Sequence, residues 1–259
     1  MNVENTKDYI SFYESQKDAP LVMLVHGFPN NALMWQEQIK FLRNDYHLLA
    51  VNLPGAWLGE EKSFQDYNIK IIGKKLAEIL SKKSDDKKKM FIVGHDLGAF
   101  IAHEVSTHCS ENLGGVVYIS GMPATMFKKR LSSITQCLKS FYVLLFNFSC
   151  IRKFAKNKAS NQLVKIVYKL SSVPANSFLW LSASKGFGAI DLYRQMTTHV
   201  FKVDDNEIDT NNSLFIFGED EKFLNLPTES EIRKTQKKSS IKILPGGHWL
   251  PATHPEQVN

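Results

Sequence analysis

Apolar and polar positions along this chain follow two different periods. Short runs of β-branched and other apolar residues, typical of buried strands, occupy residues 21–25, 47–51, 90–93, 116–119, 213–217 and 241–244. Between them, apolar residues recur three and four positions apart over residues 32–42, 66–81 and 97–108, which is the spacing of amphipathic helices. Strands that alternate with helices in this way predict an α/β protein with a mostly parallel central sheet flanked by helices.

The middle of the chain breaks this alternation. Helical spacing with few strand signals predicts helices at residues 132–148, 151–170 and 176–184. Between Met122 and Ile190 lie eleven of the 32 Lys and Arg residues and none of the 26 Asp and Glu residues. We therefore expect a core of residues 1–121 and 206–259 with an inserted helical cap, residues 122–205. Such a cap would lie over the carboxyl ends of the strands, where ligands bind in open α/β sheets.

Composition limits the class of protein. The 259 residues are 43% hydrophobic and 22% charged, which is ordinary for a folded domain. Three cysteines at irregular spacing indicate neither a disulfide framework nor a zinc site. No apolar run is long enough to span a membrane and the polar first residues do not resemble a signal peptide, so we expect a cytoplasmic protein. The charged residues 82–89 indicate a solvated loop, and we expect no nucleic-acid partner.

The sequence Gly-His-Asp-Leu-Gly at residues 94–98 follows a predicted strand and precedes a predicted helix. This is the layout of a nucleophile elbow, a sharp turn that lifts its central side chain into a pocket. That side chain is Asp96, whose carboxylate is ionised at neutral pH and can attack directly. The resulting ester suits displacement at a strained or activated carbon, as in an epoxide or a carbon–halogen bond. The alternative is an aspartate that only caps the following helix.

Two further motifs follow strand ends. His-Gly-Phe-Pro at residues 26–29 places the backbone N–H of Phe28 where it could form an oxyanion hole with that of Leu97. Pro-Gly-Gly-His-Trp at residues 245–249 places His248 after the last strand, where an imidazole can deprotonate a water. Among the eight histidines, His248 has the position expected for the chain order nucleophile, acid, base.

The acid that orients this histidine should follow the preceding strand. Three carboxylates do so: Glu219, Asp220 and Glu221. Either Asp or Glu can fix the tautomer of an imidazole and stabilise its charged form. The residues alone do not choose among the three, and a solvated acidic loop is the alternative.

With these motifs in place, the chain resembles the α/β-hydrolase superfamily over nearly its whole length, and within it the epoxide hydrolases and their dehalogenase relatives. The matching motifs lie at residues 26–29, 94–99 and 246–251. The resemblance implies a catalytic triad of Asp96, His248 and an acid. The spacing in the family favours Glu221 as this acid, with Asp220 next, although Asp is the usual residue there. The same motifs imply a substrate-binding role for three more residues, His26, Pro29 and Trp249.

Epoxide hydrolases of this type carry two lid tyrosines whose hydroxyl groups bond to the epoxide oxygen. Residues 140–143, Ser-Phe-Tyr-Val, resemble the first motif, and residues 191–194, Asp-Leu-Tyr-Arg, resemble the second, which implies Tyr142 and Tyr193. Dehalogenases typically have a halide-binding Trp after the nucleophile or in the lid, and this chain has Leu97 after Asp96. The resemblance therefore implies an epoxide hydrolase that forms an ester on Asp96, releases a vicinal diol and uses no metal or organic cofactor.

Two alternatives stay open. One is a haloalkane or haloacid dehalogenase that uses the same Asp96. The other is a ligand-binding scaffold with decayed catalysis, motivated by the displaced acid and by a chain that stops at Asn259, where relatives continue into a final packing helix.

The partner should be a hydrophobic small molecule. The basic cap could attract an anionic substrate or touch a membrane surface, although a solvated charged face is the more common explanation. Enantiopreference and oligomeric state are left open.

Overall fold

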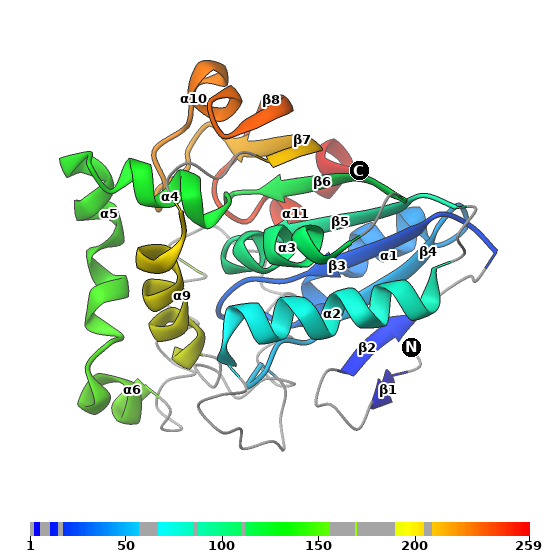
Figure 1. Cartoon of the computed structure of the whole chain (residues 1–259), viewed down its shortest axis with the longest axis horizontal. Helices are drawn as coiled ribbons and strands as arrows, with labels where there is room; N and C mark the ends of the chain where they lie inside the picture. Colours follow the sequence, from blue (N-terminus) through cyan, green and yellow to red (C-terminus); the bar gives the residue numbers. More distant parts are fainter. Residues whose placement is uncertain are drawn as a thin grey trace.

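The central sheet has eight strands in the order β1-β2-β4-β3-β5-β6-β7-β8 (Figure 1). The computed structural model describes residues 3–5, 11–14, 18–56, 67–84, 88–109, 112–155, 169, 190–204 and 209–259. Its strands are β1 (Val3–Asn5), β2 (Ser11–Glu14), β3 (Leu21–Val25), β4 (His47–Val51), β5 (Met90–His95), β6 (Leu113–Ile119), β7 (Asp209–Gly218) and β8 (Gln236–Leu244). The six strands β3 to β8 run parallel, which confirms the predicted α/β class, while β1 and β2 extend one edge in antiparallel pairing. These two strands were not predicted because they are short and carry no run of apolar residues.

The register of the parallel strands brings their carboxyl ends to one edge of the sheet. Every residue of β3 and β4 is buried, as expected for strands covered on both faces. Val25 lies level with Val51 on one side and with Gly94 on the other. The residues that follow these strands therefore lie close together, although they are far apart in the sequence.

Helices cover both faces of the sheet (Figure 1). On one face lie α2 (Ile69–Lys83) and α3 (Leu97–His108), which pack against each other. On the other lie η1 (Ala32–Trp35), α1 (Gln36–Leu42), α11 (Leu250–Thr253) and α12 (Pro255–Val258). The helix predicted over residues 32–42 begins as a 3-10 turn, capped by the side chain of Asn31, which accepts a hydrogen bond from the N–H of Leu33. The helix predicted from residue 66 begins at Ile69, because Asn68 caps it.

Four described helices lie beyond the carboxyl ends of the strands: α4 (Ala124–Arg130), α5 (Ile134–Leu145), α6 (Ser149–Ala155) and α9 (Asp191–Lys202). Of these, α9 packs on α2 and α3 of the core and on α4 and α5. The helix predicted over 132–148 corresponds to α5. Only the first part of the helix predicted over 151–170 is described, as α6, and the helix predicted over 176–184 lies outside the described residues. The boundaries of the cap at 122 and 205 stay a prediction.

The remaining described helix, α10 (Glu229–Arg233), precedes β8 and starts with a capping box between Thr228 and Glu231. Within the described ranges, we find no helix with the length and apolarity needed to cross a lipid bilayer.

Candidate active site

Asp96 lies in the turn between β5 and α3. Its backbone has φ 53° and ψ −122°, a strained conformation for a residue with a side chain. The turn needs glycine at position 98, because a Cβ atom there would collide with the carbonyl oxygens of Val25 and His26. The Asp96 side chain does not bond the second or third N–H of α3, as a capping side chain would. The structure therefore places this carboxylate as an elbow does, and the helix-cap alternative has no support.

Two backbone N–H groups hold the Asp96 carboxylate. Oδ1 accepts a hydrogen bond from the N–H of Phe28 at 3.0 Å, and the N–H of Leu97 also donates to the carboxylate. Oδ2 lies 3.4 Å from Nε2 of His248. Burial raises the pKa of Asp96, but the hydrogen bond and charge of His248 oppose it, and the net pKa is below its ordinary value. Asp96 is therefore a buried, ionised carboxylate.

His248 lies between two carboxylates. Its Nδ1 is 3.0 and 2.9 Å from the two carboxylate oxygens of Glu221, so the Nδ1–H donates to Glu221 while Nε2 faces Asp96. Burial lowers the pKa of His248, but the charges and hydrogen bonds of the two acids raise it to about 10. The imidazole is therefore charged in the resting site.

The acidic loop after β7 contributes one residue to this site. Glu221 is buried, and its Oε1 also accepts a hydrogen bond from the N–H of Phe223 at 2.9 Å. Burial raises the pKa of Glu221, and the charge and hydrogen bond of His248 lower it to below its ordinary value. Asp220 is exposed, as is Glu219. The structure therefore brings Glu221 to the imidazole and leaves Asp220 in solvent.

Two neighbours of His248 were not predicted as site residues. His95 donates from Nε2 to the backbone carbonyl of His248 at 2.9 Å, and burial lowers its pKa to about 4, so it is neutral. The ring of Phe223 lies 4.8 Å from that of His248. In the sequence, His95 lies next to Asp96 and Phe223 lies two residues after Glu221. These positions could have identified them as site residues.

Tyr142 of α5 and Tyr193 of α9 meet above Asp96. Their ring centroids are 6.0 Å apart, and their side chains are hydrogen-bonded to each other. Tyr193 also packs edge-on against Phe28 at 5.0 Å. Burial, together with the charge of Asp96, raises the pKa of both tyrosines above the ordinary value. Both hydroxyl groups therefore stay protonated and can donate hydrogen bonds.

The cavity between these groups is small. It has about 30 Å³, room for roughly one or two waters, and Asp96, Tyr142 and Tyr193 line it. Its other walls are mostly apolar, for example Met122 and Leu224. A second, apolar cavity of about 270 Å³ lies between α5 and α9. The two cavities are neighbours, since four residues line both: Phe127, Ser140, Val143 and Met196.

Three residues expected to bind substrate do not reach the cavity at Asp96. Nδ1–H of His26 donates to the carbonyl oxygen of Gly27 at 2.8 Å, and its Nε2 accepts from the N–H of Leu53 at 3.0 Å. The ring therefore connects the loop after β3 to the loop after β4. Pro29 follows Phe28 through a cis peptide bond. Trp249 is buried, with its ring 5.0 Å from that of His248. Within the described chain, none of the three is part of the cavity wall.

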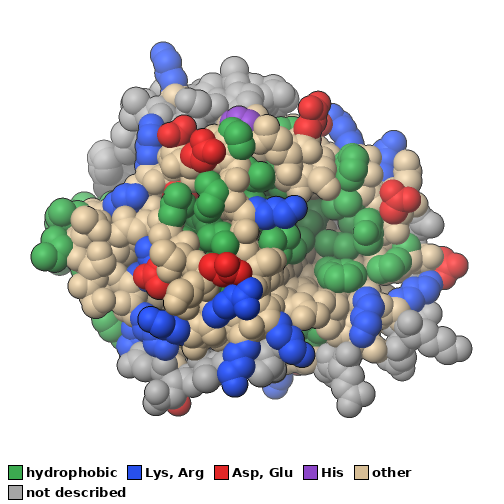
Figure 2. Space-filling view, turned by 90° about the horizontal axis from the view of Figure 1, so that it is seen from above, with side chains coloured by type: hydrophobic (Ala, Val, Ile, Leu, Met, Phe, Trp, Pro, Cys, Tyr) green, Lys and Arg blue, Asp and Glu red, His purple; other side chains and the backbone are tan. Residues whose placement is uncertain are grey.

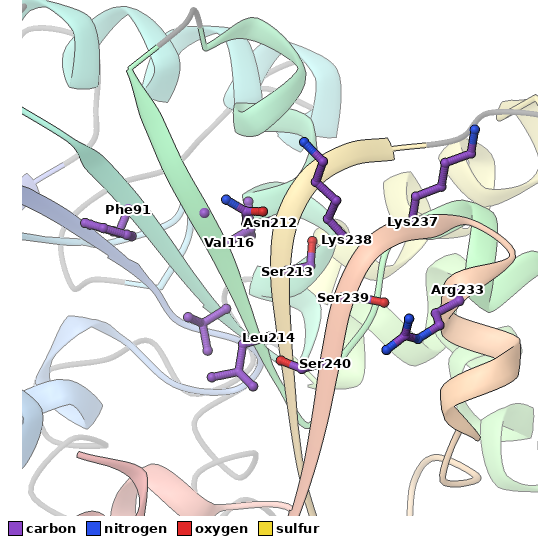
Figure 3. A pocket seen from close by; sticks show the side chains of 12 residues that line it. Phe91, Val116, Asn212, Ser213, Leu214, Arg233, Lys237, Lys238, Ser239 and Ser240 are labelled. Carbon is purple, nitrogen blue, oxygen red and sulfur yellow. The ribbon is translucent and has the colours of Figure 1, made fainter.

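A larger groove, about 550 Å³, lies at the other end of the strands (Figure 3). It is lined by residues near the start of β5, β7 and β8, among them Phe91, Asn212 and Lys238. Because Asp96 follows the opposite end of β5, this groove is separate from the site described above. Among the described residues there is no cluster of three or more His, Cys, Asp or Glu side chains suited to a metal ion.

Comparisons with known proteins identify the fold family of the chain. A family profile described as the alpha/beta hydrolase fold matches residues 20–255. The chain is 23% identical to epoxide hydrolase 3 of Mus musculus over 257 residues, which cover 93% of this chain and 69% of that protein. It is 25% identical to epoxide hydrolase 3 of Xenopus tropicalis over 262 residues, 94% of this chain and 70% of that protein. Bacillus megaterium epoxide hydrolase, solved with an inhibitor, superposes with a TM-score of 0.81 at 17% identity, covering 100% of this chain and 97% of that one.

Proposed function

This chain belongs to the α/β-hydrolase fold family, and from this premise we propose that it hydrolyses an epoxide to a vicinal diol through an ester on Asp96. One observation carries the proposal: two protonated tyrosines line the same cavity as a carboxylate that is backed by His248 and Glu221. Opening an epoxide needs a nucleophile at carbon and a hydrogen-bond donor at oxygen, and this cavity holds both. The names of the mouse and frog relatives support the same choice.

The first half of the reaction forms the ester. Oδ2 of Asp96 attacks an epoxide carbon, and the ring bond between that carbon and the oxygen breaks. The electron pair goes to the oxygen, which takes a proton from the hydroxyl group of Tyr142 or Tyr193. Their raised pKa keeps both tyrosines protonated at neutral pH until this alkoxide forms.

The second half hydrolyses the ester. The ester is neutral, so His248 loses one of the two charges that hold its proton, and its pKa falls. The imidazolium gives its proton to the tyrosinate, and the neutral Nε2 then takes a proton from a water that attacks the ester carbonyl. The N–H groups of Phe28 and Leu97 stabilise the oxyanion, and Glu221 stabilises the imidazolium that forms again. Collapse of this intermediate breaks the bond between the carbonyl carbon and the substrate oxygen. That oxygen takes the proton of the new carboxyl group, which releases the diol and restores the Asp96 carboxylate beside a charged His248.

The proposed substrate is a neutral, apolar epoxide. The described residues that line the cavity include Met122, Phe127 and Phe223 but no Lys or Arg, so a carboxylate on the substrate would find no charged partner there. The cavity of about 30 Å³ is smaller than any epoxide with a substituent, so side chains or cap helices must move when the substrate binds.

A His248→Gln variant tests the ester directly. It should form the ester and fail to hydrolyse it, so that intact-protein mass spectrometry after exposure to an epoxide panel finds an adduct on Asp96 with the mass of the whole epoxide. A matched control is His254→Gln, because His254 lies near the same end of the chain but its ring bonds to Thr253 instead of Asp96. This control should turn over and accumulate no adduct.

The same experiment separates the alternatives. A haloalkane and haloalkanoate panel is run in parallel, and an adduct that has lost a halide would reassign the protein as a dehalogenase. If the folded variant gives no adduct with any compound, an ester mechanism is wrong and a ligand-binding scaffold becomes the better description.

A further inference from the structure

Helix α5 has its apolar side chains on the outside. Ile134, Leu138, Phe141 and Leu145, with Phe148 just beyond the helix, follow a spacing of three and four residues and so share one face. These five residues, here called the α5 stripe, are between 36% and 79% exposed. A contiguous apolar face of this kind on a folded domain marks an interaction surface.

The opposite face of α5 is buried, and it carries polar side chains as well as Tyr142 and Val143. Nε2 of Gln136 donates to the carbonyl of Phe223 at 3.2 Å, and its Oε1 accepts from the N–H of Asn225 at 2.8 Å. Ser140 is also buried and accepts a hydrogen bond from Gln136. These contacts fix the orientation of the helix, so α5 cannot rotate its apolar face inward without breaking them. The exposure of the α5 stripe is therefore built into the fold.

Exposed lysines lie on the two helices that flank α5 in the chain. Exposed Lys129 lies at the end of α4, just before α5, and exposed Lys153 lies on α6, just after it. The segment from Met122 to Ile190 contains no acidic residue, although Glu231 of α10 lines one pocket with Lys129. Figure 2 shows hydrophobic side chains at the edge of the molecule where Figure 1 places α5, with both basic and acidic side chains nearby.

We propose that the α5 stripe docks on the surface of a bilayer that contains anionic lipids. Large apolar side chains next to Lys residues are the pattern of surfaces that insert at the lipid headgroup level. The other candidate, a second copy of this chain, would bring two basic segments together across the contact, and like charges oppose that. Anionic headgroups carry negative charge and attract these lysines, whereas a second copy would present lysines of its own.

If the proposed function holds, the apolar cavity between α5 and α9 is a route from the bilayer to Asp96. Leu144 and Phe201 line the cavity and are half or more exposed, so it reaches the surface beside the α5 stripe. Its inner end borders the cavity at Asp96. An apolar epoxide dissolved in the bilayer would enter through this opening.

Sedimentation with vesicles tests the proposal without using activity. The unaltered 259-residue protein should bind phosphatidylcholine vesicles that contain about 30% phosphatidylserine and should bind pure phosphatidylcholine vesicles much less. The double variant Leu138→Ser/Phe141→Ser should lose binding by about tenfold or more, since it removes apolar area that inserts. Lys129→Glu/Lys153→Glu should weaken binding to the anionic vesicles alone.

The matched control is Phe41→Ser/Ile71→Ser, which changes an equally exposed Phe and an exposed Ile on α1 and α2, away from α5. It should bind vesicles as the unaltered protein does, and circular dichroism should show that all variants fold. Failure of the unaltered protein to bind anionic vesicles would overturn the proposal, as would equal loss in the control. A dimer by light scattering that Leu138→Ser/Phe141→Ser dissociates would show instead that a second copy covers the stripe.

Discussion

The core half and the cap half of the candidate site are positioned by different forces. In the core half, Asp96, His248 and Glu221 each make directional hydrogen bonds of about 3 Å to the backbone or to one another. In the cap half, Tyr142 and Tyr193 are placed chiefly by packing against aromatic rings, with centroids 5.0 to 6.0 Å apart. Hydrogen bonds fix the distance and angle of their atoms, whereas ring packing tolerates several arrangements. The core half is therefore preorganised, and the cap half is the part that can adjust to a substrate.

The two halves meet at the loop that carries Glu221. Two side chains of α5 bind this loop: Nζ of Lys139 donates to the carbonyl of Glu221 at 3.2 Å, and Gln136 bonds to Phe223 and Asn225. The helix that carries Tyr142 thus also holds the loop of Glu221, the proposed acid of the triad. A movement of α5 would therefore change the positions of Tyr142 in the cap half and of Glu221 in the core half.

The largest expected effect is on the core half. Glu221→Gln should lower kcat for diol formation by about 10³-fold, because a neutral amide does not stabilise the imidazolium of His248 and can present its NH₂ group, instead of its oxygen, to Nδ1–H. Asp220→Asn is the matched control, since this neighbour is exposed, and its rate should stay within about twofold of the unaltered protein. If Asp220→Asn lowers the rate more than Glu221→Gln does, Asp220 is the acid that orients His248, and the contact between Glu221 and His248 is not the one used in catalysis.

The core half was also the half that the sequence could predict from its own residues. Asp96, Phe28 and His248 each follow a strand, and parallel strands end at one edge of the sheet, so chain order alone brings these residues together. The choice between Glu221 and Asp220 was different. It depends on which side chain of a short loop turns inward, and that is decided by contacts such as the N–H of Phe223, which no local pattern encodes.

The cap half could be placed only through a family resemblance. Helical spacing predicted α5 but could not say which face turns inward, because its buried face carries polar side chains and its exposed face is apolar. The partnership of Tyr142 with Tyr193 joins two helices separated by about fifty residues, and nothing local specifies it. The same limit explains why His26 and Trp249 were expected at the substrate: the motifs fix their positions in the chain, while their rings turn toward backbone and His95.

The next largest effect is on the cap half. Tyr193→Phe and Tyr142→Phe should each slow ester formation by about 10²-fold, since one donor to the departing oxygen remains in each variant. Removing both donors should slow it further. Rapid-mixing measurements with a fluorescent epoxide separate ester formation from ester hydrolysis. In these variants the second step should keep its rate, whereas Glu221→Gln should slow the second step most.

A buried tyrosine that does not line the cavity at Asp96 provides the control for this comparison. Tyr118 is fully buried and its hydroxyl lies 3.4 Å from Nδ1 of His103, so Tyr118→Phe also removes a buried hydroxyl. Its rate of ester formation should be unchanged. If Tyr118→Phe is as slow as the cap variants, the loss reflects general disturbance of the fold, and the tyrosines are not proton donors to the substrate.

The smallest effect concerns the proton on His248. In Asp96→Asn the carboxylate charge is gone while the side chain keeps its shape, as in the ester, so the pKa of His248 should fall from its raised value of about 10. One nearby negative charge changes proton affinity by a factor on the order of ten or more. NMR titration of the His248 ring in the two proteins measures the change, and Asp220→Asn, which alters an exposed acid, should leave it untouched. An unchanged pKa in Asp96→Asn would mean that Glu221 alone holds the proton, and that ester formation does not release His248 to act as the base.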